Sequence, residues 1–140
     1  MLARKQGLAR GLSRLRRNMM VGILFDQNAG PAGAAVLSMG RVCSATDLPG
    51  ILAQKFDARA AVLYPRRLKG WSVEVDATVL HCPKTPRHVT LESNAWVDRT
   101  LQRSDAECAD WLWMHNRWKM GYAVENRLRL DWKKHYLPDV

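Results

Sequence analysis

The stretch VGILFDQNAGPAGAAVLSMGR, Val21 to Arg41, decides how the rest of the sequence is interpreted. An apolar run, Met19 to Phe25, stops at three polar residues, and a second apolar run, Ala34 to Met39, follows a glycine-containing loop. The first run has no helical spacing and is bounded by turn residues, so it predicts a buried strand. In open α/β sheets, polar residues at the carboxyl end of such a strand face the ligand crevice.

The polar residues after the first run are therefore candidates for chemistry. Asp26 and Gln27 would lie at the edge of the crevice, but Asp and Asn also bond to their own backbone in simple turns. Gly30 and Gly33 are open to the same two interpretations, because glycine permits either close approach to a ligand or a tight turn.

Composition and charge restrict the class of protein. The chain of 140 residues has room for one domain, and its hydrophobic content of 47% is that of a globular protein. No apolar run approaches the length of a membrane-spanning helix. The three cysteines fit no zinc or redox spacing, and neither a metal nor another cofactor is expected. A net charge of +9 predicts an acidic partner, which charge alone leaves open between nucleic acid, anionic lipid and an acidic carrier protein.

The first half of the chain gives several local signals. Leu8, Leu12 and Leu15 form a narrow stripe within the basic stretch 1–18, which suits a helix on an anionic membrane, a packed helix with a basic face, or an RNA-binding arm. Thr46-Asp47 predicts the N-cap of a helix over Leu48 to Phe56, with Pro49 in its first turn.

The second half predicts a hairpin and a long helix. Arg59 to Tyr64 is a short buried strand that Pro65 ends, and Trp71 to Thr78 alternates as a half-exposed strand does. The short turn between them indicates an antiparallel hairpin. A loop over His81 to Arg87 precedes a helix that Thr90 or Ser93 would cap and that would run through 111–118. The order of elements predicts an α/β fold with a mixed sheet flanked by helices, in one domain over 1–140, of which 120–140 is a basic C-terminal tail.

Two segments resemble a known family. VGILFDQNAG with its glycine loop, and DWLWMHNRWK at Asp110 to Lys119, are similar to the central block and the tryptophan-rich ending of the lipid A biosynthesis acyltransferases. These belong to the lysophospholipid acyltransferases. The resemblance covers roughly Arg10 to Lys119 and implies part of that family's layered α/β fold.

The resemblance also implies a reaction, in which a His-x4-Asp or His-x4-Glu motif deprotonates a lipid hydroxyl that attacks an acyl thioester. No acid stands five residues after any of the four histidines, and a dyad of His115 with Asp110 would place the acid on the wrong side. The sequence therefore resembles only the C-terminal half of such an enzyme, and we expect a truncated domain without activity of its own.

The resemblance gives the candidate site residues their roles. Asp26 would support the catalytic histidine, and the expected substrate-binding residues are Gln27, Gly30, Gly33, Arg41, His115, Arg117 and Lys119. It implies acyl carrier protein or acyl-coenzyme A as acyl donor, a lipid A-type or lysolipid acceptor, and a peripheral position on anionic lipid at the cytoplasmic face of the bacterial inner membrane. Nucleic acid is not an expected partner, although a basic non-catalytic lipid- or nucleic-acid-binding module is the alternative interpretation.

Overall fold

The computed structural model describes residues 12–17, 19–80, 85–111 and 115–136. It shows a mixed α/β fold, which confirms the predicted class. Its elements are β1 (Ala34–Ser38), β2 (Arg41–Ala45), α2 (Leu48–Phe56), β3 (Ala61–Arg67), β4 (Val73–Val79), α3 (Pro86–Leu101), α4 (Asp105–Asp110) and α5 (Tyr122–Tyr136). The strands form two separate antiparallel sheets, β1–β2 and β3–β4. Of the basic N-terminal stretch, residues 12–15 are helical, and residues 1–11 lie outside the described part.

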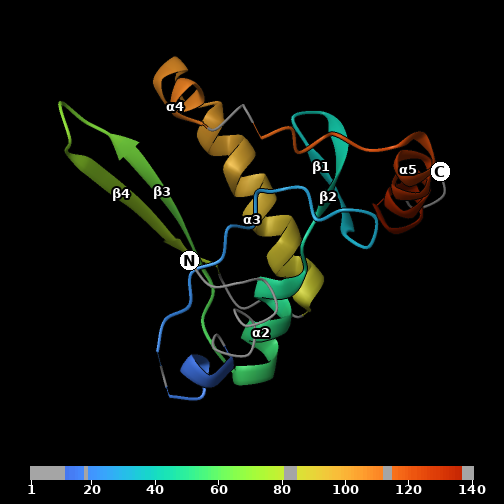
Figure 1. Ribbon diagram of the computed structural model, residues 1–140, viewed down its shortest axis with the longest axis horizontal. Helices are drawn as coiled ribbons and strands as arrows, with labels where there is room; N and C mark the ends of the chain where they lie inside the picture. The colour runs from blue at the N-terminus through green and yellow to red at the C-terminus, as the bar shows by residue number, and fades with distance from the viewer. Residues whose placement is uncertain (1–11, 18, 81–84, 112–114, 137–140) are drawn as a thin grey trace.

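Helix α3 is the centre of the molecule. In Figure 1 it runs between the β3–β4 hairpin and the unit of β1, β2 and α5, with α2 beside its first turns. Trp96, Val97 and Leu101 of α3 form one buried cluster with Val62 and Tyr64 of β3. On its other side, the carboxylate of Asp98 accepts hydrogen bonds from Ser38 Oγ at 2.9 Å and from Met39 N at 2.8 Å. The helix therefore holds both sheets.

The predicted strand over Met19 to Phe25 is wrong. These residues are irregular, and Met20 and Leu24 are 87% and 73% exposed. A strand needs a hydrogen-bonded neighbour, and among the described residues neither sheet pairs with this run. Phe25 nevertheless packs against the cluster around Trp96, so the run is attached to the core by its last apolar residue.

The second apolar run is a strand as predicted, but the sequence interpretation missed its partner β2. The turn between them consists of Met39 and Gly40, both with positive φ (48° and 73°). Two such residues make the turn type that matches the twist of a two-residue hairpin. The Met-Gly pair before Arg41 was thus the available signal for β2.

The next two elements were largely predicted. Helix α2 has the expected bounds, with Thr46 Oγ1 accepting from Leu48 N at 3.2 Å. The antiparallel hairpin of β3 and β4 is also present, but β3 continues through Pro65 to Arg67 instead of ending there. Both strands of a two-stranded sheet are edge strands, where a missing backbone N–H is tolerated.

The long helix expected from Thr90 or Ser93 to residue 118 is wrong at both ends. Helix α3 begins at Pro86, where the loop was predicted to continue, and its N-cap is Thr85. It ends at Leu101, and α4 begins after Ser104, whose Oγ accepts from Glu107 N. Ser104 and Glu107 have the spacing of a capping box, which starts a new helix. The stretch assigned to a tail contains α5, whose Leu128 is fully buried.

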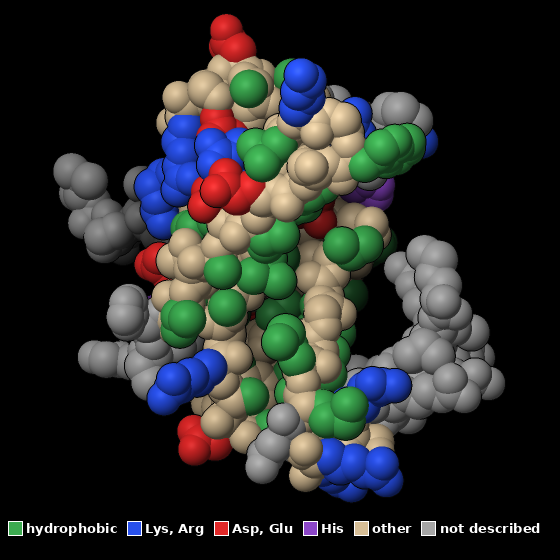
Figure 2. Space-filling view, turned by 90° about the vertical axis from the view of Figure 1, so that its left-hand side faces the viewer, with side chains coloured by type: hydrophobic (Ala, Val, Ile, Leu, Met, Phe, Trp, Pro, Cys, Tyr) green, Lys and Arg blue, Asp and Glu red, His purple; other side chains and the backbone are tan. Residues whose placement is uncertain are grey.

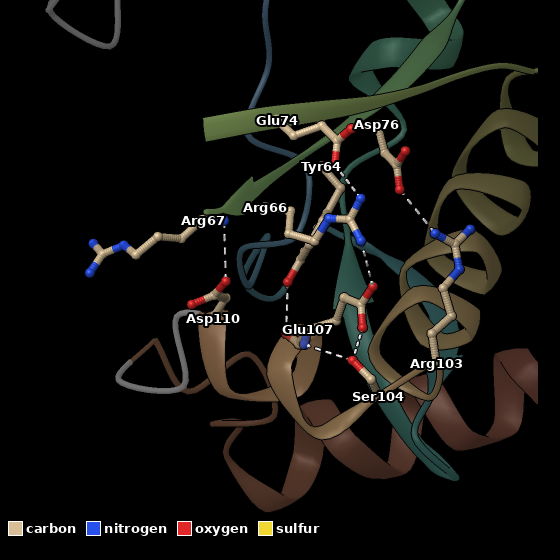
Figure 3. Close-up of polar contacts among 9 residues, drawn as sticks. All are labelled: Tyr64, Arg66, Arg67, Glu74, Asp76, Arg103, Ser104, Glu107 and Asp110. Carbon is tan, nitrogen blue, oxygen red and sulfur yellow. Dashed lines mark hydrogen bonds and ion pairs between the residues drawn. The ribbon is translucent and has the colours of Figure 1, made fainter. Parts of the chain in front are cut away.

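Polar contacts tie the hairpin to the helices (Figure 3). Tyr64 Oη donates to the Glu107 carbonyl at 2.7 Å, and Arg66 lies between the carboxylates of Glu74 and Glu107. Arg103 Nη1 is 3.1 Å from Asp76 Oδ2. These contacts all use the inner face of the hairpin. Its two carboxylate partners give Arg66 a structural role.

The loop before β1 depends on a glycine. A Cβ atom at Gly33 would overlap Ser44 Oγ and lie 2.8 Å from Ala29 Cβ. Ser44 cannot turn away freely, because it is buried and its Oγ donates to the Gly30 carbonyl at 2.6 Å. We therefore predict that Gly33→Ala lowers the free energy of unfolding by about 1–3 kcal/mol, the usual cost of overpacking, as measured by urea denaturation. Gly22→Ala, where nothing lies within 4 Å of the added atom, is the control. Equal stability of the two variants would contradict this packing.

Candidate functional site

The two segments that resemble the family, 21–30 and 110–119, meet at Asn28. Its backbone N–H donates to Nε2 of His115 at 3.1 Å, across 87 residues of chain. Its side-chain amide donates to the carbonyl oxygens of Arg117 at 3.1 Å and Lys119 at 2.8 Å. Asn28 thus fixes the polar loop, residues 26–28, against the His115–Lys119 segment. The sequence interpretation did not include Asn28 among the candidate site residues.

Asp26 and Gln27 form the bend that precedes this contact. Asp26 is half-buried and Gln27 is exposed. The side chain of Asn28 also makes a local turn, since its Oδ1 accepts from Gly30 N at 2.7 Å. Within Asp26-Gln27-Asn28, the side chain that bonds to the backbone of the turn is therefore that of Asn28. The Asp26 carboxylate and the Gln27 amide do not take part in this hydrogen bond.

Gly30 and Gly33 are each required to be glycine for a different structural reason. Gly30 has a φ of +78°, a conformation that favours glycine. Gly33 permits the close approach of the loop to β2 described above. The backbone conformation at Gly30 and the packing at Gly33 therefore explain why both residues are glycine without a ligand.

One ring nitrogen of His115, Nε2, already accepts a hydrogen bond from the protein. An Nε2 atom that accepts a hydrogen bond has no proton, so the neutral ring carries its proton on Nδ1. The Nε2 lone pair is therefore occupied by the Asn28 amide and is not free to remove a proton from a substrate. Asp110, the acid of the alternative dyad, accepts instead from Arg67 N at 3.3 Å through its Oδ2 (Figure 3). His115 is thus a residue that positions the polar loop.

Arg117 is buried and does not lie on a binding surface. It is 2% exposed, and its Nη2 donates to Oδ1 of Asn94 on α3. The guanidinium also lies beside Cys43 of β2, where burial raises the pKa of the thiol although the nearby Arg117 acts in the opposite direction. Arg117 was expected to bind substrate, but its guanidinium is turned into the protein interior. Arg117 instead links α3, β2 and the polar loop.

Trp118 and Arg41 form the outer part of the site. The Arg41 guanidinium lies 5.9 Å from the centroid of the Trp118 ring, within the range of a cation–π interaction. Trp118 Nε1 donates to the Ser38 carbonyl at 3.3 Å. Trp111 is the C-cap of α4 and packs on the Trp96 cluster, whereas Trp118 lies in a turn against the cluster of Val36 and Cys43. The two tryptophans therefore do not share a helix face. Lys119 is exposed.

The described residues contain neither a metal-binding cluster nor a membrane-spanning helix. No group of three or more His, Cys, Asp or Glu side chains there is placed to hold a metal ion. In that part of the chain, no helix combines the length and the apolar character needed to cross a bilayer.

The structure defines an α/β protein in which an apolar run ending in Asp-Gln-Asn is fixed to a His-x-Arg-Trp-Lys segment. The model of the family described as bacterial lipid A biosynthesis acyltransferase matches residues 1–120, and the chain belongs to this family. Family membership implies an acyl donor and a lipid acceptor. No curated protein and no solved structure matches the chain.

The role of Asn94 is testable by truncation. Asn94→Ala removes the acceptor of a buried guanidinium, and hydrogen bonds to charged groups contribute about 1.5–3 kcal/mol. We predict a loss of that size in the free energy of unfolding, measured by urea denaturation. Gln54→Ala on the exposed side of α2 should cost much less. If the Asn94 variant were as stable as the Gln54 variant, Arg117 would not depend on this contact.

Proposed function

We propose that this chain acts in the transfer of an acyl group from the thioester of acyl carrier protein or coenzyme A to a hydroxyl of a lipid A-type or lysolipid acceptor, at the cytoplasmic face of the inner membrane. The observation that carries the proposal is the contact of Asn28 with the His115–Lys119 segment. This contact joins the two segments that resemble the family, and Asp26 and Gln27 directly precede it in the chain, which supports the proposal.

The proposed reaction needs a histidine that this sequence does not contain in the required context. In the transfer, a histidine takes the hydroxyl proton, the oxygen forms a bond to the thioester carbonyl carbon, and the carbon–sulfur bond breaks to release a thiolate that takes up the proton. With Nε2 of His115 occupied, a His-x4-Asp or His-x4-Glu motif from outside residues 1–140 would supply the base. Asp26 would then stabilise the imidazolium charge that develops.

The outer face of the β3–β4 hairpin supports a position at a membrane. Alternate residues of each strand point away from the core on this face, and its exposed apolar side chains are Ala61, Leu63, Pro65, Val73, Val75, Ala77 and Val79. Figure 2 shows hydrophobic side chains gathered over this side of the molecule. At the tip, Trp71 is 100% exposed and adjoins Lys69. A continuous apolar face of this kind indicates an interaction surface.

Charge favours an anionic bilayer as the partner of this face. Arg67 is the only charged residue in outward register on the two strands, because Glu74 and Asp76 lie on the inner face beside Arg66 and Arg103. A second copy of a chain with a net charge of +9 would be repelled, whereas anionic lipid would be attracted. A tryptophan beside a cation at the tip suits the interface between headgroups and acyl chains.

The role of Asp26 is tested in a fusion of this chain to the His-x4-Asp/Glu-containing half of a lipid A acyltransferase. With acyl carrier protein thioester and a lipid A-type acceptor, we predict turnover by the fusion and at most background by the isolated chain, since general-base catalysis is worth about 10²- to 10⁴-fold. Asp26→Asn should lower kcat about tenfold or more without changing Tm, because it removes only the charge.

Asp57→Asn is the matched control for this variant, since Asp57 is exposed at the end of α2 with a φ of 48°, which Asn also adopts. It should leave kcat unchanged. Unchanged kcat in the Asp26 variant, or efficient turnover by the isolated chain, would contradict the proposed role.

Membrane association is tested by sedimentation with phosphatidylglycerol vesicles at low salt. We predict that the chain sediments with the vesicles and that Val75→Asp reduces the bound fraction severalfold, because it places a charge on the apolar face. Gln54→Asp makes the same change in net charge away from the face and should reduce binding only slightly. Equal loss in both variants would reject the hairpin as the docking face. Preferential binding to an oligonucleotide at the same salt would favour the nucleic-acid alternative.

A further inference from the structure

A groove lies between the β1–β2 turn and α5. It has a volume of about 530 Å³, and its lining includes Arg41, Arg129, Leu130, Trp132 and Lys133. Arg129 and Lys133 are one helical turn apart, so they lie along the same side of α5. This volume is within the range that accommodates small ligands.

The lining combines cations with apolar groups. None of the lining residues is acidic, and three of them are cationic: Arg41, Arg129 and Lys133. Leu130 lies among them although it is 69% exposed, and Trp132 is half-buried. Such a set is complementary to a ligand that has an anionic end and an apolar end.

Two of the three cations are held in place by neighbours. Arg41 lies over the ring of Trp118 at 5.9 Å, and Arg129 Nη2 donates to Glu125 Oε1 at 2.7 Å. Glu125 offsets part of the charge of Arg129, which leaves Arg41 and Lys133 as the main anion-attracting groups. Guanidinium and ammonium groups are the usual partners of phosphate oxygens.

Helix α5 is fixed against the rest of the protein, so the groove does not depend on a loosely attached element. Leu128 is fully buried, and Arg127 Nη2 donates to the carbonyl of Pro31 in the glycine loop. The same contact attaches α5 to the loop that follows Asp26 and Gln27 in the chain. The helix lies beyond residue 120, where the family match ends.

We propose that this groove binds a phosphate group joined to an apolar chain, with Arg41 and Lys133 on the phosphate and Leu130 and Trp132 against the chain. Two sources carry a phosphate on a chain with apolar parts: the phosphate of a lipid, and the phosphopantetheine arm of an acyl donor, which has a dimethyl group near its phosphate and polar amides further along. The inference rests on the proposed function, because it assigns a place to the phosphate of one of its two substrates.

The test is calorimetric titration of the full chain with monomeric dihexanoyl phosphatidic acid, 4′-phosphopantetheine and inorganic phosphate, without any acyl thioester. We expect at least one phosphate with an apolar chain to bind more tightly than inorganic phosphate. Arg41→Gln and Lys133→Gln should each raise its Kd about tenfold, because each removes a charge-assisted contact. Lys55→Gln, which removes an exposed cation on α2, should leave that Kd within about twofold. Thermal melts check that the variants are folded.

The outcomes separate the sources and the proposals. Tighter binding of the phosphatidic acid assigns the groove to the lipid, and tighter binding of phosphopantetheine assigns it to the donor. Equal weakening by all three substitutions, or equal affinity for inorganic phosphate, would overturn the inference. An inactive fusion with intact groove binding would count against the proposed function alone. An active fusion whose chain binds no phosphate ligand would count against the groove alone.

Discussion

The three hydrogen bonds from Asn28 to the His115–Lys119 segment are the constraint on which the site depends. They join segments far apart in sequence, and they rest on a buried cation, because the segment is anchored where Arg117 contacts Asn94 on α3. Arg117 is buried, its Nη2 donates to Asn94, and its backbone carbonyl accepts from the Asn28 side chain. The polar loop, the central helix and β2 are therefore positioned together, and Asp26 and Gln27 take their place from that unit.

The same architecture explains why so much apolar surface remains exposed. Each sheet is a single hairpin, and α3 covers one face of β3–β4 while no described element covers the other. Two-stranded sheets are marginal by themselves and need a packed face. Here Val62 and Tyr64 provide that face, and the contacts of Arg66 and Arg103 reinforce it. The outer face is consequently left for a partner such as a lipid surface.

Local signals in the sequence predicted the elements that local chemistry determines. Thr46 and Pro49 mark α2, and the alternation after Trp71 marks β4. The strand expected over 19–25 failed because a strand requires a neighbour, which periodicity does not reveal. The long helix failed because Ser104 starts a new one. The sequence also indicated both segments that resemble the family. It did not reveal that Asn28 links them, because that contact spans about 90 positions. Nor did it reveal that Arg117 is buried, because burial depends on packing against α3.

The hydrogen bond from Asn28 N–H to His115 Nε2 can be observed directly as a ¹⁵N–¹⁵N coupling across the bond in NMR spectra of the labelled chain. We predict a cross-peak between the Asn28 amide nitrogen and Nε2 of His115. His115 should then show the Nδ1–H tautomer. A neutral His115 in the Nε2–H tautomer, with no coupling and a rapidly exchanging Asn28 amide, would contradict the account.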